Sequence, residues 1–311
     1  MQPAPLYQDL EGVPEGGTAV FVTTSDGTRI RVAYWQGGRR TALVFPGRTE
    51  FVERYGHVVT RLQALDFNVV VIDWRGQGLS DRHEGRLDRG YVGHFSDYQQ
   101  DIEAALAVPD IAALPAPQVL FSHSMGGCIA LRALSEGRVT PQAAIFSAPM
   151  WGLPHVPKLW PLLSAVDILG RPFGLDTMLV PGTKPGFYPL EQPFEGNVLT
   201  GNPIQYARMG AQLRAHPELG LGGPTIHWAH EAAREMEAMR TAPVPDIPML
   251  VFVGSDEKVI DPEAVKARAN TLPDARLEII PGGRHEMWME TQEIRDTVWQ
   301  KTAAFLETCE V

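Results

Sequence analysis

The most constraining feature of this chain is the stretch Leu-Phe-Ser-His-Ser-Met-Gly-Gly at residues 120–127. A short apolar run leads directly into a serine, and two glycines follow where a helix would begin. In such a strand–turn–helix elbow the serine lies on a sharp bend that lifts its hydroxyl clear of the backbone. The positions two before and two after the serine must be small, and they hold Ser122 and Gly126. We therefore predict Ser124 as a nucleophile and expect the bend to tolerate Ser122 in place of the usual glycine.

A serine hydroxyl is a poor nucleophile at neutral pH, so this reading requires a histidine base that is itself held by a carboxylate. With this kind of elbow the chain order is serine, acid, histidine. An alternating run at 276–280 reads as a strand, and the glycine pair 282–283 and then His285 follow it. This order and placement predict His285 as the base.

The acid is expected on the turn that follows another apolar run of strand length, residues 247–253. Acidic residues cluster there, where the strand ends, and Asp256 and Glu257 are neighbours. Asp261 is a better helix N-cap than a catalyst, since Pro262 and Glu263 follow it and a helical pattern comes next. The residues alone leave Asp256 and Glu257 open.

Three further stretches carry a family resemblance: Phe-Pro-Gly-Arg-Thr-Glu-Phe at 45–51, Asp-Trp-Arg-Gly-Gln-Gly-Leu-Ser at 73–80, and Gly-Gly-Pro-Thr-Ile-His-Trp at 222–228. With the serine elbow, they make the chain similar over nearly its whole length to the α/β-hydrolases that cleave monoacyl lipids, the bacterial lysophospholipase and monoacylglycerol lipase branch. The resemblance implies a serine esterase that acts on lysophospholipids or similar single-chain esters, with no cofactor and no metal. It also implies that Asp73 belongs to a structural turn.

The same resemblance bears on the acid. In the family the carboxylate follows the strand-end glycine by three positions and precedes an aliphatic pair, which here favours Glu257, ahead of Val259 and Ile260. Asp256 stays as the alternative acid. Most relatives use aspartate at this place, whereas the lysophospholipase branch resembles this chain in having glutamate.

An oxyanion hole needs backbone N–H groups aimed at the developing negative charge. One is expected from Met125, directly after the nucleophile, and the second from Arg48 in the loop that follows the strand at 41–45. The Arg48 side chain could meet a substrate phosphate or pair with Glu50 or Glu53, and we expect the ion pair.

Composition is consistent with one compact enzyme of 311 residues, of which 44% are hydrophobic. The net charge of −10 and the lack of any basic block make nucleic acid an unexpected partner. No signal-like start and no apolar stretch of ~20 residues is present, so we expect a soluble cytoplasmic protein. With only Cys128 and Cys309, we expect no disulfide framework.

Along the chain, strand-like runs alternate with helical ones, which predicts an α/β fold with a mostly parallel sheet and helices on both faces. We expect residues 1–149 and 243–311 to form this core. Residues 150–242 are rich in proline and aromatics and break the rhythm, so we expect a cap of short helices and loops. Such a cap could hold an acyl chain, touch lipid surfaces transiently, or simply have its own small core.

Other functions stay open on the sequence alone. A short-chain carboxylesterase or an aminopeptidase of the same fold would share the serine, acid and histidine and differ in the cap. A non-catalytic protein that binds a lipid or another small molecule is a third reading. His227 and His230 lie close together on a predicted helix but lack a third ligand at a known spacing, so we expect a packed helix face there and not a metal site.

Overall fold

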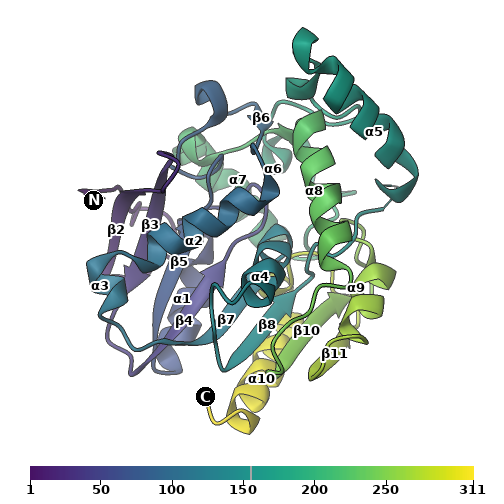
Figure 1. Cartoon of the computed structure of the whole chain (residues 1–311). Helices are drawn as coiled ribbons and strands as arrows, with labels where there is room; N and C mark the ends of the chain where they lie inside the picture. The colour runs from purple at the N-terminus through teal and green to yellow at the C-terminus, as the bar shows by residue number, and fades with distance from the viewer. Residues whose placement is uncertain (155) are drawn as a thin grey trace.

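The structure is a computed structural model, and it describes residues 1–154 and 156–311, without the side chains of 156–159. Within these residues a nine-stranded sheet has the order β1-β2-β3-β5-β4-β7-β8-β10-β11. Pairing is antiparallel from β1 to β5 and parallel from β5 to β11. The expected mostly parallel sheet is confirmed, and Figure 1 shows helices on both of its faces, with α2 and α4 in front of it.

The strands are β1 Gln2–Pro3, β2 Gly17–Thr23, β3 Arg29–Trp35, β4 Arg40–Phe45, β5 Phe67–Asp73, β6 Arg89–Gly90, β7 Pro117–His123, β8 Ala143–Ser147, β9 Gly223–Pro224, β10 Met249–Gly254 and β11 Ala275–Ile280. The helices are α1 Gly56–Ala64, α2 Tyr98–Leu106, α3 Pro109–Ala112, α4 Met125–Ser135, α5 Val156–Gly170, α6 Tyr188–Glu191, α7 Pro203–Ala215, α8 Ile226–Met239, α9 Pro262–Ala269 and α10 Gln292–Thr308. Short 3-10 turns lie at Val52–Tyr55, His83–Gly85, Phe95–Asp97, Arg171–Phe173, Leu175–Thr177, Pro217–Leu219 and Met287–Met289.

The central strands form the core because both of their faces are covered. Every residue of β5, β8 and β10 is buried, as expected for parallel strands between two helical layers. Since the carboxyl ends of parallel strands meet at one edge of the sheet, the loops after β4, β7, β10 and β11 are brought together there. No helix among the described residues is both long and apolar enough to cross a bilayer.

A fully buried arginine joins β3 to the loops at this edge. Arg31 Nε lies 2.7 Å from Asp73 Oδ2, and its Nη1 lies 2.7 Å from Glu53 Oε1. Asp73 also accepts the amides of Val52 and Leu79, both at 2.8 Å. These contacts agree with the structural role expected for Asp73, and they leave the Glu53 carboxylate already occupied.

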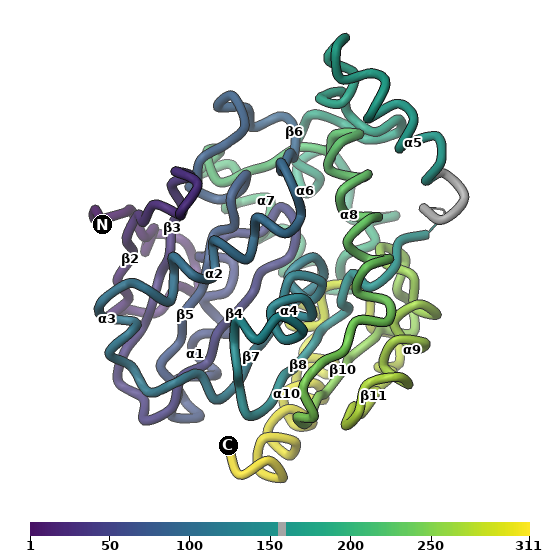
Figure 2. Tube along the Cα trace, viewed as in Figure 1, coloured from purple at the N-terminus to yellow at the C-terminus, as the bar shows by residue number. Residues whose placement is uncertain are grey.

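Residues 150–242, called the cap segment below, lie between β8 and β10. Figures 1 and 2 show this segment at one end of the molecule, with α5 outermost and the C-terminus at the opposite end. The expectation of short helices is wrong for three elements, since α5, α7 and α8 have 15, 13 and 14 residues. Pro161 lies inside α5, whereas Pro203 lies in the first turn of α7. A first-turn proline is readily accommodated, because its missing N–H would have no partner within the helix.

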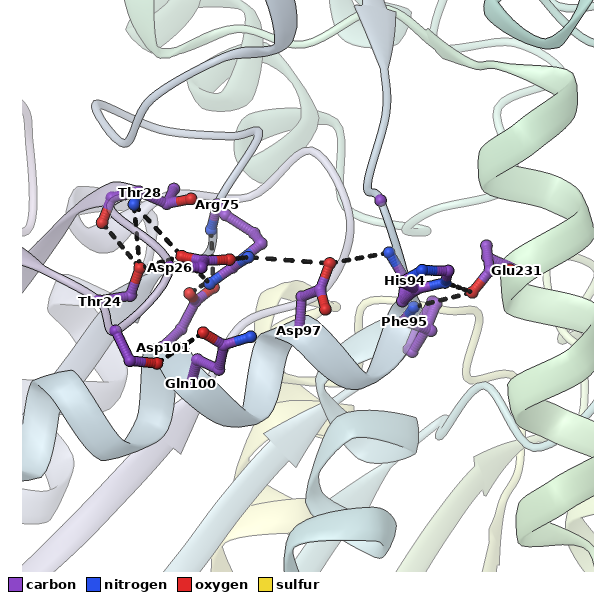
Figure 3. Close-up of polar contacts among 12 residues, drawn as sticks. Thr24, Asp26, Thr28, Arg75, His94, Phe95, Asp97, Gln100, Asp101 and Glu231 are labelled. Carbon is purple, nitrogen blue, oxygen red and sulfur yellow. Dashed lines mark hydrogen bonds and ion pairs between the residues drawn. The ribbon is translucent and has the colours of Figure 1, made fainter. Parts of the chain in front are cut away.

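Helix α8 belongs to the main hydrophobic core, because Trp228, Ala232 and Met236 pack into the same cluster as the sheet. A series of polar contacts also links α8 to the loops of the core. Figure 3 shows Asp26 and Asp97 beside Arg75, at 2.6 and 3.8 Å, and His94 reaching toward α8, where its Nδ1 lies 3.5 Å from Glu231 Oε2. The cap segment is therefore not an insertion with a wholly separate core.

Candidate active site

Ser124 lies on a strained turn between β7 and α4. Its φ of 48° and ψ of −117° place a non-glycine residue in a conformation that costs about 1–3 kcal/mol. Three backbone hydrogen bonds hold it there: its amide donates to Ser147 O at 3.1 Å, and its carbonyl accepts from Gly127 N at 2.9 Å and from Met150 N at 2.8 Å. The surrounding strands thus impose the bend that the sequence predicts at this position.

The small residues flanking the serine are explained by close packing. A Cβ on Gly126 would lie 2.1 Å from the carbonyl oxygen of Phe45 and 2.5 Å from that of Pro46, so α4 begins directly against the end of β4. Ser122 is buried, and its hydroxyl donates to Ile145 O at 3.3 Å. The bend therefore accommodates Ser122, as expected.

His285 follows β11, and Glu257 lies on the turn after β10. Nδ1 of His285 is 2.8 Å from Oε2 of Glu257, and both side chains are buried. The other oxygen of Glu257 accepts the amides of Val259 at 2.6 Å and Ile260 at 3.2 Å. Asp256 is exposed and accepts a hydrogen bond from Ser255 at 3.1 Å. Of the two acids left open by the residues, the structure places Glu257 against the imidazole.

The electrostatics favour an ionised Glu257 beside a proton-binding His285. Burial alone would raise the pKa of Glu257, but His285 and the two backbone amides hold it below its usual range. Burial works against the charged form of His285, yet its pKa is raised because Glu257 attracts and accepts a hydrogen bond from the ring. With Nδ1 donating to the carboxylate, Nε2 is the ring atom left to accept a proton.

The imidazole lies close to the serine elbow. The ring centroids of His285 and His123, the residue before Ser124, are 4.7 Å apart. Among the described residues no hydrogen bond joins the Ser124 hydroxyl to His285, while the bond between His285 and Glu257 is formed. Nucleophile–base hydrogen bonds are often long in a free enzyme and shorten when substrate binds.

Two backbone amides predicted to face a developing oxyanion belong to Met125 and Arg48. In the part of the chain that the structure describes, neither amide donates to a protein acceptor. The loop that carries Arg48 lies against the elbow, because a Cβ on the preceding Gly47 would be 3.0 Å from Cδ2 of His123. The amide of Arg48 in this loop and that of Met125 at the start of α4 are therefore two backbone donors near the elbow without an acceptor among the described residues.

The buried side chain of Glu50 holds this loop in place. Oε2 of Glu50 accepts the amide of Gly47 and the hydroxyl of Tyr55, the latter at 2.5 Å. Its other oxygen lies 3.4 Å from Nε of Arg54. Burial and the nearby charge of Glu286 raise the pKa of Glu50, so this side chain tends to keep its proton.

The network continues under the histidines. Arg54 Nη2 donates to Glu286 Oε1 at 2.7 Å, and Glu286 Oε2 lies 3.4 Å from Nε2 of His123. His123 also contacts Ser147 O through Nδ1 at 3.0 Å, and burial lowers its pKa to about 4. A neutral His123, held by these two contacts, supports the elbow from below and is not placed to act as a second base.

Glu50, His123 and Glu286 also form the group of possible metal ligands found among the described residues, with ligand atoms within 4.8 Å of one another. Arg54 already lies against both acidic side chains, Glu50 and Glu286. His227 on α8 contacts Asp167 at 2.8 Å and the carbonyl of Gly93 at 2.8 Å, which is a packed helix face as expected.

The expected ion pair of Arg48 with Glu50 or Glu53 is wrong. Glu50 lies against Arg54, and Glu53 lies against Arg31. Arg48 instead donates from Nη2 to the carbonyl oxygen of Gly222, at 2.6 Å. Glu53 is occupied by Arg31, which is distant in sequence on β3, and Glu50 is occupied by Arg54, which is better placed on the adjacent turn.

Sequence reasoning also missed the network formed by Glu50, Arg54 and Glu286. The one local signal is that Glu286 directly follows the predicted base and that the loop after β4 carries Glu50 and Arg54 four residues apart. Its other contacts cross 232 positions of the chain and have no local pattern.

Comparisons with known proteins show the family to which the chain belongs. Residues 37–292 match the model of the family described as serine aminopeptidase, S33. Lysophospholipase L2 of Escherichia coli K12 is 30% identical over 269 residues, which cover 82% of this chain and 77% of that protein. Probable lysophospholipase L2 of Haemophilus influenzae is 27% identical, covering 86% of this chain and 84% of that protein.

Solved structures show the same fold. A soluble variant of monoglyceride lipase from Saccharomyces cerevisiae superposes with a TM-score of 0.72 at 20% identity, covering 98% of this chain and 99% of that one. A carboxyl esterase from Bacillus coagulans gives 0.73 at 20% identity, covering 96% and 100%. The chain therefore belongs to the serine aminopeptidase S33 family of α/β-hydrolases, in the branch similar to lysophospholipases and monoglyceride lipases, and it is a serine ester hydrolase.

Proposed function

We propose that Ser124, His285 and Glu257 form a catalytic triad that hydrolyses the carboxylic ester of single-chain lipids, lysophospholipids or monoacylglycerols. The observation that carries the proposal is the buried hydrogen bond between His285 and Glu257, beside a serine held at positive φ. The names of the lysophospholipase and monoglyceride lipase relatives support the lipid substrate.

The reaction follows as two-step acyl transfer. His285 takes the proton of Ser124 through Nε2 as the hydroxyl attacks the ester carbonyl, and Glu257 stabilises the imidazolium that results. The free amides of Met125 and Arg48 donate to the oxyanion. The imidazolium returns its proton to the departing alcohol, and water, activated by the same ring, then releases the fatty acid.

We further propose that the cap segment, residues 150–242, covers this site and meets the lipid. Its outermost part, on and after α5, exposes apolar side chains that have no described packing partner in the core, notably Ile168, Leu169, Phe173 and Met178. Apolar side chains exposed in one region of a surface mark a contact site, and an aggregated amphiphilic substrate is the partner that this enzyme would meet. The contact would be transient.

The decisive experiment compares the wild type with Ser124→Ala on lysophospholipids, monoacylglycerols, short p-nitrophenyl esters and aminoacyl p-nitroanilides. We expect turnover of the long-chain esters by the wild type and a loss of several orders of magnitude in Ser124→Ala, with unchanged folding. Preference for the anilides would select the aminopeptidase alternative, and preference for short esters the carboxylesterase. Failure of the wild type to react with a fluorophosphonate would favour a binding protein.

A further inference from the structure

A cavity of about 390 Å³ separates the loop after β4 from the cap segment. On the core side its wall is formed by Arg48 and Thr49, and on the cap side by residues 182–184, 186, 188, 191–192 and 221–224. Arg48 is thus both a wall residue of the cavity and the proposed donor of one oxyanion amide. A ligand group in this cavity would contact the residue whose backbone amide is proposed to face the oxyanion.

The Arg48 guanidinium is a cation without a carboxylate partner among the described residues. Nη2 donates to Gly222 O, and the guanidinium carbon lies 5.1 Å from the centre of the Trp228 ring. Nε is buried and has no described acceptor. Arg82, by contrast, is similarly buried but donates to three carbonyl oxygens. Arg48 therefore keeps donors that no described protein group uses.

The side chain is also held in position. A Cβ on Gly90 would lie 2.5 Å from Nη2 of Arg48, so the guanidinium packs directly on this glycine. Burial lowers the pKa of Arg48 to about 10, which leaves the group charged at neutral pH. A desolvated, fixed cation is an electrostatically favourable place for an anion.

The remaining charges of the wall nearly cancel. Lys184 and Glu191 both line the cavity, and Nζ of the first lies 3.8 Å from Oε2 of the second. Lys184 is also largely exposed, so water screens its charge. The uncompensated charge on this wall is therefore that of Arg48.

We propose that Arg48 binds the phosphate of a lysophospholipid headgroup, so that the cavity holds the headgroup and the substrate class is a phosphate-bearing single-chain ester. This assignment rests on the function proposed above. The reach is suitable: in an extended lysophospholipid the ester carbonyl carbon and the phosphorus are about 6–7 Å apart, as are the backbone and guanidinium of an extended arginine. One residue would then contact the oxyanion with its amide and the phosphate with its planar fork.

The first test is a ratio of kcat/KM values for a lysophospholipid and a monoacylglycerol with the same acyl chain. We expect Arg48→Gln to lower this ratio about 10- to 100-fold, because a charge-assisted contact is lost for one substrate alone. Arg48→Lys keeps the charge without the planar fork, so its ratio should lie between those of the wild type and Arg48→Gln. Lys184→Gln removes the other cation of the same wall and serves as the matched control. It should change the ratio less than about twofold.

The outcomes separate this assignment from the function beneath it. If the wild type cleaves neither substrate, the proposed function fails. If it cleaves both and Arg48→Gln lowers both equally, the phosphate site is wrong and the function stands. An equal effect of Lys184→Gln would mean general attraction to a charged wall and would also overturn the assignment.

Binding gives a readout that is independent of turnover. In the Ser124→Ala background, the wild-type Arg48 should bind the lysophospholipid more tightly than the matched monoacylglycerol, and Arg48→Gln should abolish that difference. The source of the phosphate is tested with inhibitors of monoacylglycerol cleavage by the wild type. Glycerol 3-phosphate should inhibit more strongly than inorganic phosphate at equal concentration, and equal inhibition would contradict a headgroup site.

Discussion

Two arginines of the loop after β4 lie six residues apart and have opposite surroundings. Arg54 is enclosed by the acidic side chains of Glu50 and Glu286, beneath the serine elbow. Arg48 faces the cavity at the cap segment with one carbonyl acceptor. The enclosed arginine belongs to the machinery that positions the site, whereas the other leaves donors for a ligand. We propose that the core determines the chemistry and that the cap side determines substrate recognition, and this comparison separates the two.

The largest effect is expected where the core network meets the reaction. Glu257→Ala should lower kcat about ten thousand-fold, because the imidazole loses both its orientation and the charge that stabilises the imidazolium. Asp256→Ala is the matched control, since its side chain is exposed and accepts from Ser255. Steady-state kinetics on a monoacylglycerol would measure both. A larger loss in Asp256→Ala would transfer the acid role to that residue.

The second prediction compares the two arginines directly by stability. Arg54→Met leaves two buried carboxyl groups without their cation and should lower the free energy of unfolding by about 3–5 kcal/mol. Arg48→Met removes one hydrogen bond together with a desolvated, unpaired charge, so we expect a change of less than about 1 kcal/mol. Urea unfolding would measure both values. Similar losses for the two variants would break the comparison.

The third prediction concerns the outer surface of the cap segment. Leu169→Ser combined with Phe173→Ser should lower the rate on aggregated lipid about tenfold, because two exposed apolar side chains no longer insert into it. The rate on a monomeric short ester should not change. Ile204→Ser on α7 alters an equally exposed apolar residue elsewhere and serves as control. Equal losses on both substrates would place the effect inside the enzyme and not at a lipid surface.

These differences also explain what could be predicted from the sequence. The elbow, the strands before Glu257 and His285 and the N-cap at Asp261 depend on neighbouring residues, and the structure places each as expected. The partner of Arg48 could not be predicted, because Glu53 is taken by an arginine of β3, which lies 22 residues earlier. Helix lengths in the cap segment were missed because its richness in proline and aromatics was taken to predict short helices, whereas α5 continues through Pro161.

The smallest expected effect is a shift in the pH profile of the reaction. His285 must be neutral to accept the serine proton, and Glu257 and Glu286 raise its pKa in spite of burial. Activity should therefore fall as pH drops through a midpoint above about 6.5, the value of an unperturbed histidine. Glu286→Gln keeps an acceptor for Arg54 but removes one negative charge near the ring, so the midpoint of kcat/KM should move to lower pH by about half a unit. Asp256→Asn, which neutralises an exposed acid adjacent to Glu257, should leave the midpoint unchanged, and a shift to higher pH in Glu286→Gln would show that the core network does not act on His285 through its charge.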